Sequence, residues 1–297
     1  MRLYTIAAAF LLTLSLLLLS CASPAAVSAF AQSAQNGIND GPPLFNDLYS
    51  SCVRRETLRP DLQIYPEFVP SGSKQAAPKD NSAIASCSRF NPASKELDKM
   101  SDVLSSYFKS LQQLAGFNTA AVAGSAEAVG QNAATAAGLS YTQIESAGKL
   151  ASLITQLATE GYQTSRLVKY VHDADPEIAD LTSAFERATR TYLDLLDQEQ
   201  QTVTALYQTV GEGSMGSMLF LLNHAYHQDI DKLQERRAGA MVYAGLLKDI
   251  REGHHKLVAD GKNLSAKELM VTLAPYTSKI NGALAELPMD KQPSQKE

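Results

Sequence analysis

Residues 94–116, SKELDKMSDVLSSYFKSLQQLAG, decide the fold class of this chain. Apolar side chains recur there at alternating steps of three and four residues, which places one continuous stripe on a single face of a helix. The stripe consists of Leu97, Met100, Leu104, Tyr107, Leu111 and Leu114. Because so long an apolar stripe has to be covered by another element, the segment predicts a helix that packs against further helices.

The rest of the chain repeats this helical period, and alternation typical of strands is nearly absent. Further helices are expected over about 140–172, from Asp175-Pro176 to Gly211, over about 217–258, and from a capping box of Ser265 and Glu268 to about 287. The helix over 217–258 is expected to bury Leu219, Leu222, Tyr226, Ile230 and Leu233. We therefore predict an all-α fold: an elongated antiparallel helical bundle over 93–287, with a disordered tail over 288–297.

The first 24 residues, MRLYTIAAAFLLTLSLLLLSCASP, combine Arg2, an apolar run and Cys21 directly after Leu18-Leu19-Ser20. This arrangement resembles a bacterial lipoprotein signal. The resemblance implies that residues 1–20 are a signal peptide, that cleavage precedes Cys21, and that Cys21 then carries diacylglycerol and an acylated amine. The chain would be anchored to a membrane of the bacterial cell envelope, facing the periplasm or the exterior.

Ordinary signal peptidase offers an alternative, because Ala29-Phe30-Ala31 is also a small-x-small cleavage site. Cleavage after Ala31 would release a secreted protein without Cys21. A retained transmembrane anchor is disfavoured, since the apolar run of about 14 residues is shorter than the ~20 that a spanning helix needs.

The segments before the bundle differ in composition. Residues 21–43 are rich in Ala, Ser, Gln, Asn and Gly, which predicts a flexible tether. Residues 44–92 are expected to form an irregular arm that contains one short helix, ending before Pro60. In an oxidising compartment the even pair Cys52 and Cys87 predicts a disulfide, and closing its loop contributes roughly 4 kcal/mol in the chain-entropy model.

Composition argues against nucleic acid as a partner. The formal net charge is −5, and the longest basic clusters are the pairs Arg54-Arg55 and Arg236-Arg237. Phosphate binding needs a more concentrated positive surface.

Metal and catalytic motifs are sparse. His224, His227 and Asp231 share one face of a helix and are the weak candidates for a metal site, but that face lies away from the apolar stripe, which favours a solvated role. His254 and His255 are explained by the favourable dipole at a helix C-terminus. No cofactor and no catalytic residue is predicted.

Residues 119–139, TAAVAGSAEAVGQNAATAAGL, place small side chains four residues apart. This spacing allows close helix contact, so the segment is either a tightly packed helix of the bundle or a self-associating or membrane-inserting helix.

The helical part, over about 94–233, also resembles uncharacterised bacterial envelope proteins, a resemblance that implies no activity. We predict a lipid-anchored, non-enzymatic helical bundle that acts as an interaction or scaffold module for an unknown envelope protein. The alternatives are a metal- or small-ligand-binding bundle and a membrane-active or self-associating protein.

Overall fold

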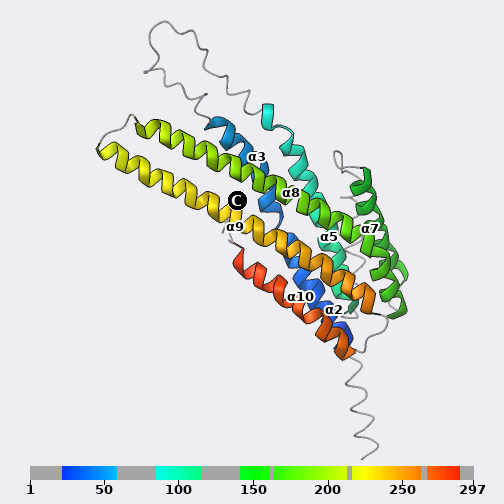
Figure 1. Ribbon diagram of the computed structural model, residues 1–297. Coiled ribbons are helices and arrows are strands. Elements are labelled where there is room, and N and C mark those ends of the chain that lie inside the picture. Colours follow the sequence, from blue (N-terminus) through cyan, green and yellow to red (C-terminus); the bar gives the residue numbers. More distant parts are fainter. Residues whose placement is uncertain are drawn as a thin grey trace, which may run out of the picture. The chain divides into compact units, whose positions relative to one another are not determined.

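The structure is a computed structural model that describes residues 22–58, 85–115, 141–160, 164–212, 216–261 and 266–287 (Figure 1). The regular elements in these ranges are α-helices, so the predicted all-α helical bundle is confirmed. They are α2 (Ala22–Asn39), α3 (Pro42–Thr57), α5 (Phe90–Ala115), α7 (Tyr141–Glu160), α8 (Thr164–Glu212), α9 (Ser217–Asp260) and α10 (Ala266–Glu286). None of the described helices combines the length and the apolar character needed to cross a membrane.

The helices group into two compact units. The described part of unit 1 lies within residues 1–40, 99–185 and 245–285, and that of unit 2 within 41–98 and 186–244, with the last residue of α10. Helices α5, α8 and α9 therefore contribute one part to each unit.

Unit 1 is built around the predicted stripe of α5. The stripe side chains between Met100 and Leu114 are at most 1 % exposed. Phe108 meets Phe30 of α2 edge to face, with ring centroids 6.1 Å apart, and the Ser101 hydroxyl donates to the carbonyl of Ile38 at 3.0 Å. Residue numbers fall in α2 as they rise in α5, so these two helices are antiparallel.

Helix α7 packs on α8 in unit 1, also antiparallel. The Ser146 hydroxyl donates to Asp180 at 3.1 Å, and the Lys149 ammonium lies 3.7 Å from the buried carboxylate of Glu177.

Residues 22–39 form helix α2, so the predicted flexible tether is wrong. Its buried side chains recur on one face: Val27, Phe30, Ala31, Ala34 and Ile38. Small residues let the helix approach its neighbours closely. A Cβ at Gly37 would lie 2.7 Å from Cδ2 of Leu246 on α9, a distance that real Cβ contacts do not show. Close backbone approach thus buries a segment whose composition is typical of a linker.

The predicted break at Asp175-Pro176 is also wrong. Helix α8 runs without interruption through Pro176, and the helix expected over 140–172 is instead α7 followed by the first turns of α8. A proline inside a helix removes one hydrogen bond and costs about 3 kcal/mol. Pro176 is exposed, whereas Val171, Ala174 and Ile178 around it are buried, so packing on both sides keeps the helix continuous.

In unit 2, helix α3 confirms the short helix expected before Pro60. It buries Phe45, Leu48 and Cys52 on one face, and the Phe45 ring meets that of Tyr243 on α9 edge to face at 5.7 Å.

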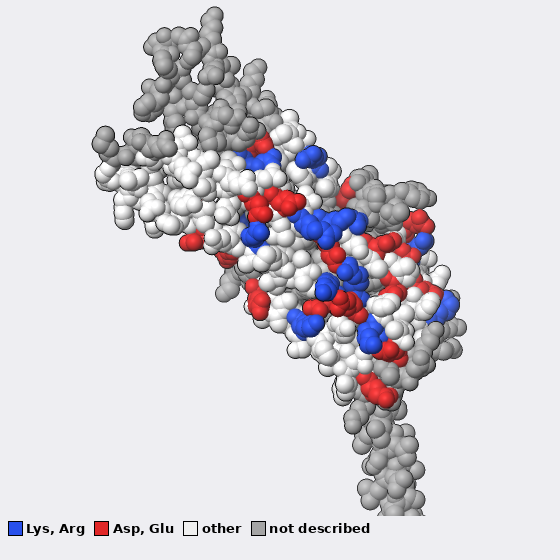
Figure 2. Space-filling view, in the orientation of Figure 1, with Lys and Arg blue, Asp and Glu red and all other residues white. Residues whose placement is uncertain are grey.

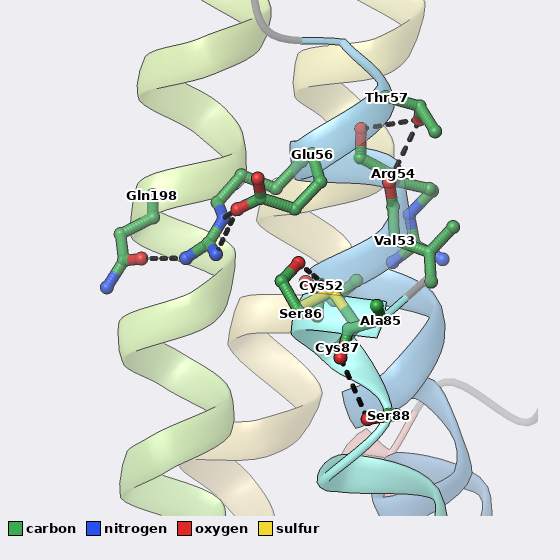
Figure 3. The surroundings of a disulfide bond; sticks show 12 residues. Cys52, Val53, Arg54, Glu56, Thr57, Ala85, Ser86, Cys87, Ser88 and Gln198 are labelled. Carbon is green, nitrogen blue, oxygen red and sulfur yellow. Dashed lines mark hydrogen bonds and ion pairs between the residues drawn. A yellow bond between two sulfur atoms is a disulfide. The ribbon is translucent and has the colours of Figure 1, made fainter. Parts of the chain in front are cut away.

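The predicted disulfide between Cys52 and Cys87 is confirmed (Figure 3). The sulfurs are 2.01 Å apart and the Cα atoms 5.7 Å apart. The bridge joins α3 to the helical turn at 85–87, just before α5. Residues 59–84 of the predicted irregular arm lie outside the described residues, as does the tail predicted over 288–297.

Helices α8 and α9 form an antiparallel hairpin. In unit 2 Arg237 pairs with Asp197, and the Tyr207 hydroxyl donates to Asp229 at 2.9 Å. Gly216, which directly precedes α9, has φ of 62°. Glycine adopts this left-handed conformation without strain, so the position suits the turn into α9.

Candidate functional site

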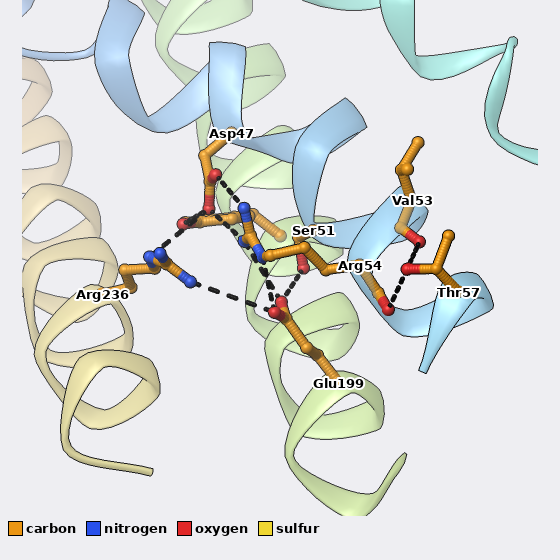
Figure 4. Close-up of polar contacts among 8 residues, drawn as sticks. Asp47, Ser51, Val53, Arg54, Thr57, Glu199 and Arg236 are labelled. Carbon is orange, nitrogen blue, oxygen red and sulfur yellow. Dashed lines mark hydrogen bonds and ion pairs between the residues drawn. The ribbon is translucent and has the colours of Figure 1, made fainter. Parts of the chain in front are cut away.

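A charged cluster, half-buried except for the buried Glu199, joins α3 and α8 in unit 2 (Figure 4). Arg54 of α3 donates to Asp47 at 2.8 and 2.9 Å, and its Nε donates to Glu199 of α8 at 2.6 Å. Ser51 donates to Glu199 at 2.7 Å, and Tyr192 donates to Asp47 at 2.6 Å. Both carboxylates therefore accept hydrogen bonds from two side chains.

Arg236 extends this cluster to α9, lying 3.9 Å from an oxygen of each of the two carboxylates. Although burial opposes its charge, hydrogen bonds from Arg54 to Asp47 and Glu199 raise the pKa of Arg54 above its usual value. Burial, together with the Asp47 carboxylate, raises the pKa of Tyr192. Two arginines balance two carboxylates, and the cluster works as a clamp between three helices.

A second polar cluster lies inside unit 1, where α5, α8 and α9 meet. The Tyr107 hydroxyl is 2.7 Å from Nε2 of His254, and Nδ1 of His254 is 2.9 Å from one Asp175 oxygen. Nδ1 of His255 is 2.9 Å from the other Asp175 oxygen. With Nδ1 of His254 donating to Asp175, its Nε2 accepts a hydrogen bond from the Tyr107 hydroxyl.

Burial lowers the pKa of His254 despite its bond to Asp175, and burial also raises the pKa of Tyr107 well above its usual value. Although burial favours the neutral acid, the hydrogen bonds from His254 and His255 hold the pKa of Asp175 below its usual value. Tyrosine, histidine and aspartate thus follow the order of a catalytic relay. Tyr107 and His254 are both 0 % exposed, however, so the relay presents no hydroxyl to a solute and serves to hold three helices.

The sequence-based explanation of His254 as a residue at a helix end, placed by the dipole, is therefore wrong. Its ring is buried and forms hydrogen bonds to α5 and α8, whereas His255 is exposed and shares only Asp175.

The weak metal candidates lie on the exposed surface of α9. His224, His227 and Asp231 are all exposed. Nε2 of His224 is 3.0 Å from the Gln228 amide nitrogen, and the His227 ring lies beside that of Tyr226 at 5.5 Å. In the part of the chain that the structure describes, no group of three His, Cys, Asp or Glu side chains could hold a metal ion.

The start of α9 exposes an uninterrupted group of large apolar side chains. Met218 is 56 % exposed, Leu219 48 %, Phe220 73 % and Leu221 61 %. Of the five residues predicted to be buried on this helix, Ile230 and Leu233 are, but Leu219 is not. We name the four residues 218–221 the apolar end.

A groove of 630 Å³ runs beside the apolar end, between α8 and α9 of unit 2. Its lining includes Tyr207 and Tyr226, whose rings meet edge to face with centroids 5.5 Å apart. Burial and the hydrogen bond to Asp229 raise the pKa of Tyr207 to about 12. The walls include Thr204, Gln208, Gly211, Gly216, Leu219, Phe220, Leu222 and Asn223.

The same part of the hairpin is nearly free of charge. Glu212 is the only Asp, Glu, Lys or Arg in residues 200–228. The described atoms at this end are white in Figure 2, and charged side chains begin further along the two helices. This gap in the charge pattern, next to the run MLFLL at 218–222, is the signal in the sequence that points to the site.

The predicted lipidation residue Cys21 and the small-residue segment 119–139 lie outside the described residues. Comparison of the chain with known proteins finds no matching family model, no matching curated protein and no matching solved structure.

Proposed function

We propose that this chain is a lipid-anchored, non-enzymatic protein of the bacterial cell envelope, and that the apolar end of its α8–α9 hairpin is its interaction surface. The observation that carries the proposal is the exposure of four successive large apolar side chains at 218–221. Exposed apolar patches rimmed by polar residues are typical of sites that contact a partner or a membrane.

Two features support an address outside the cytoplasm. The first is the resemblance of residues 1–24 to a lipoprotein signal. The second is the Cys52–Cys87 disulfide, because structural disulfides persist in oxidising compartments and are rare in the cytosol.

Helix α2 favours cleavage before Cys21 over cleavage after Ala31. The second site lies inside α2, and Phe30 and Ala31 are both 0 % exposed. Cleavage there would remove Val27, Phe30 and Ala31 from the core of unit 1, whereas cleavage before Cys21 leaves α2 intact.

The polar clusters support a scaffold that presents a surface. The charged clamp of Arg54, Asp47 and Glu199 fixes α3 against α8, and Arg236 brings in α9. These contacts fix α8 and α9 relative to α3 at the clamp. The apolar end is therefore carried by a hairpin whose helices are held together.

The address is tested by metabolic labelling with a fatty acid. We expect label on the wild-type protein and none on Cys21→Ala, and labelling that persists in the variant would overturn the lipid anchor. The N-terminal residue of the mature chain provides a second measurement, because Edman sequencing that starts at Gln32 would show cleavage after Ala31.

The interaction surface is tested by site-specific photocrosslinking in intact cells. A benzoyl-phenylalanine in place of Phe220 should give adducts that the same group in place of Met241 does not give. Met241 is a suitable control because it lies on the same helix and is 55 % exposed. Equal adducts from both positions, or none from position 220, would contradict the proposed surface.

A further inference from the structure

The apolar end is apolar on all sides of the helix, and this geometry restricts what can cover it. Successive residues of an α-helix are about 100° apart, so Met218, Leu219, Phe220 and Leu221 together span about 300° around the axis. All four are 48–73 % exposed. A protein partner that docks on one face of the hairpin leaves the opposite side chains in water, whereas a helix that is apolar all round is stable when it is surrounded.

We infer that the apolar end enters the interfacial region of a lipid bilayer, so that the α8–α9 hairpin contacts a membrane end-on. This inference rests on the proposed function and names the partner of the same site. The contact does not involve a spanning helix.

The length of the apolar end fits shallow insertion. Residues 218–222 rise about 7.5 Å along the helix axis. Apolar faces of interfacial helices enter the boundary between headgroups and acyl chains by about 5–10 Å.

The residues that follow, up to Gln228, are mostly polar, which suits the headgroup level of a bilayer. Asn223, His224, His227 and Gln228 are exposed on the next turns of α9. Tyr226 is half-buried, and so is Tyr207 across the groove, with its hydroxyl bonded to Asp229 at 2.9 Å. Tyrosine, with an apolar ring and a polar tip, is enriched at this level of membrane proteins.

The apolar end lies in a stretch of the chain that is nearly free of charge. Asp, Glu, Lys and Arg side chains are costly in lipid, and only Glu212 interrupts residues 200–228. Binding through this end is therefore driven by apolar transfer, and the affinity should change by less than about twofold between low and high salt, because no cluster of exposed basic residues is involved.

The chain contains no tryptophan, so one introduced residue becomes a unique fluorescent reporter. The probe is Phe220→Trp in the full mature chain with Cys21→Ala, mixed with vesicles of phosphatidylethanolamine and phosphatidylglycerol at 3:1. We expect a blue shift of the emission and quenching by lipids brominated near the headgroup. The matched control is Met241→Trp, also exposed on α9, and it should show neither effect.

Flotation with the same vesicles measures the contribution of the apolar end. Phe220→Ser with Leu221→Ser should lower the partition coefficient by at least about tenfold, because two large side chains lose their apolar transfer. The control pair is Met241→Ser with Val271→Ser, which also removes two side chains that are more than half exposed and should retain binding. Circular dichroism melts of both pairs should overlay that of the parent chain.

The outcomes separate the lipid inference from the proposed function. If vesicles leave the emission of the Phe220→Trp chain unchanged, or if both serine pairs float equally, the lipid inference is wrong. If position 220 then crosslinks to a protein, the apolar end is still the interaction surface, and its partner is a protein. If it gives no adduct, both the proposed surface and the lipid inference are wrong. A dimer in sedimentation equilibrium that Phe220→Ser with Leu221→Ser abolishes would assign the apolar end to a second copy of the chain and also overturn the lipid inference.

Discussion

Helix α2 and the start of α9 differ both in the size of their side chains and in how far those side chains are buried. Helix α2 consists largely of small and polar residues, yet its face from Val27 to Ile38 lies inside unit 1. The first turn of α9 carries the large apolar residues 218–221, yet these side chains are exposed in unit 2. A neighbouring helix, more than the size of a side chain, therefore decides whether that side chain is buried. Where α5 and α9 pack on α2, small residues such as Ala31 and Ala34 are buried together with Phe30. At the start of α9, where no described helix covers them, leucine and phenylalanine remain exposed.

The largest effect is expected from a phenylalanine on the buried side of this comparison. Phe30 is 0 % exposed and packs on the Phe108 ring, so Phe30→Ala should lower the free energy of unfolding by about 3–5 kcal/mol. Urea denaturation followed by circular dichroism measures it. A loss below about 1 kcal/mol would mean that α2 is not part of the core.

A smaller loss of free energy of unfolding is expected from a change in the charged clamp of unit 2, the unit that contains the apolar end. Arg54→Ala leaves Glu199 buried without its closest cation and should cost about 3 kcal/mol, the lower part of the range for a broken buried pair, because the Arg54 side chain is 30 % exposed.

The matched variant for the clamp is Arg237→Ala. Arg237 pairs with Asp197 at the surface, where the side chains are 40 % and 44 % exposed, so we expect a loss below about 1 kcal/mol. Equal losses in the two variants would contradict the role of Arg54 as a clamp.

The buried polar cluster of unit 1 should make stability depend on pH. Burial lowers the pKa of His254 below its usual 6.5, so the unfolded chain binds a proton more readily than the folded one. The contribution of neutral, buried His254 to the free energy of unfolding is fully present above pH 6.5, and it declines as the pH falls toward the lowered pKa.

The groups that face His254 are Tyr107 on α5 and Asp175 on α8, with His255 beside it on α9. The lowered pKa of Asp175 adds a loss only at lower pH, below about 4, where an ordinary aspartate takes up its proton. Urea titrations at about pH 7.5, 6.5 and 5.5 should show the decline in the parent chain and a flatter profile in His254→Gln. Parallel profiles would indicate that another group titrates.

The smallest effect is expected from the other phenylalanine. Phe220 is 73 % exposed, and Phe220→Ala should change the free energy of unfolding by less than about 0.5 kcal/mol. A loss close to that of Phe30→Ala would show that the apolar end is covered within the chain itself.

Much of the fold could be predicted because its signals are local. The α5 stripe repeats every three or four residues, Ile230 and Leu233 keep the same period on α9, and the pair Cys52 and Cys87 needs only an oxidising address. Helix α2 and the continuity of α8 could not be predicted from composition or from Pro176, since close packing against helices far along the sequence decides both.

The polar interior depends on the same distant contacts. His254 bonds to a tyrosine 147 residues away and to an aspartate 79 residues away, so no spacing rule along the chain could bring them together. For the candidate site, the uncharged stretch 200–228 is a signal that can be read from the sequence. The helical period nevertheless assigned Leu219 to the core, because periodicity does not reveal whether another element covers that part of the helix.

Helix α2 begins at Ala22, immediately after the proposed lipid-bearing Cys21. A flexible tether of the predicted length would place the domain at an average distance of roughly 25 Å from its anchor. A helix packed into unit 1 gives no such slack. With the proposed lipid on Cys21, unit 1 would therefore lie at the bilayer surface, and a partner of the protein would have to come within reach of that surface.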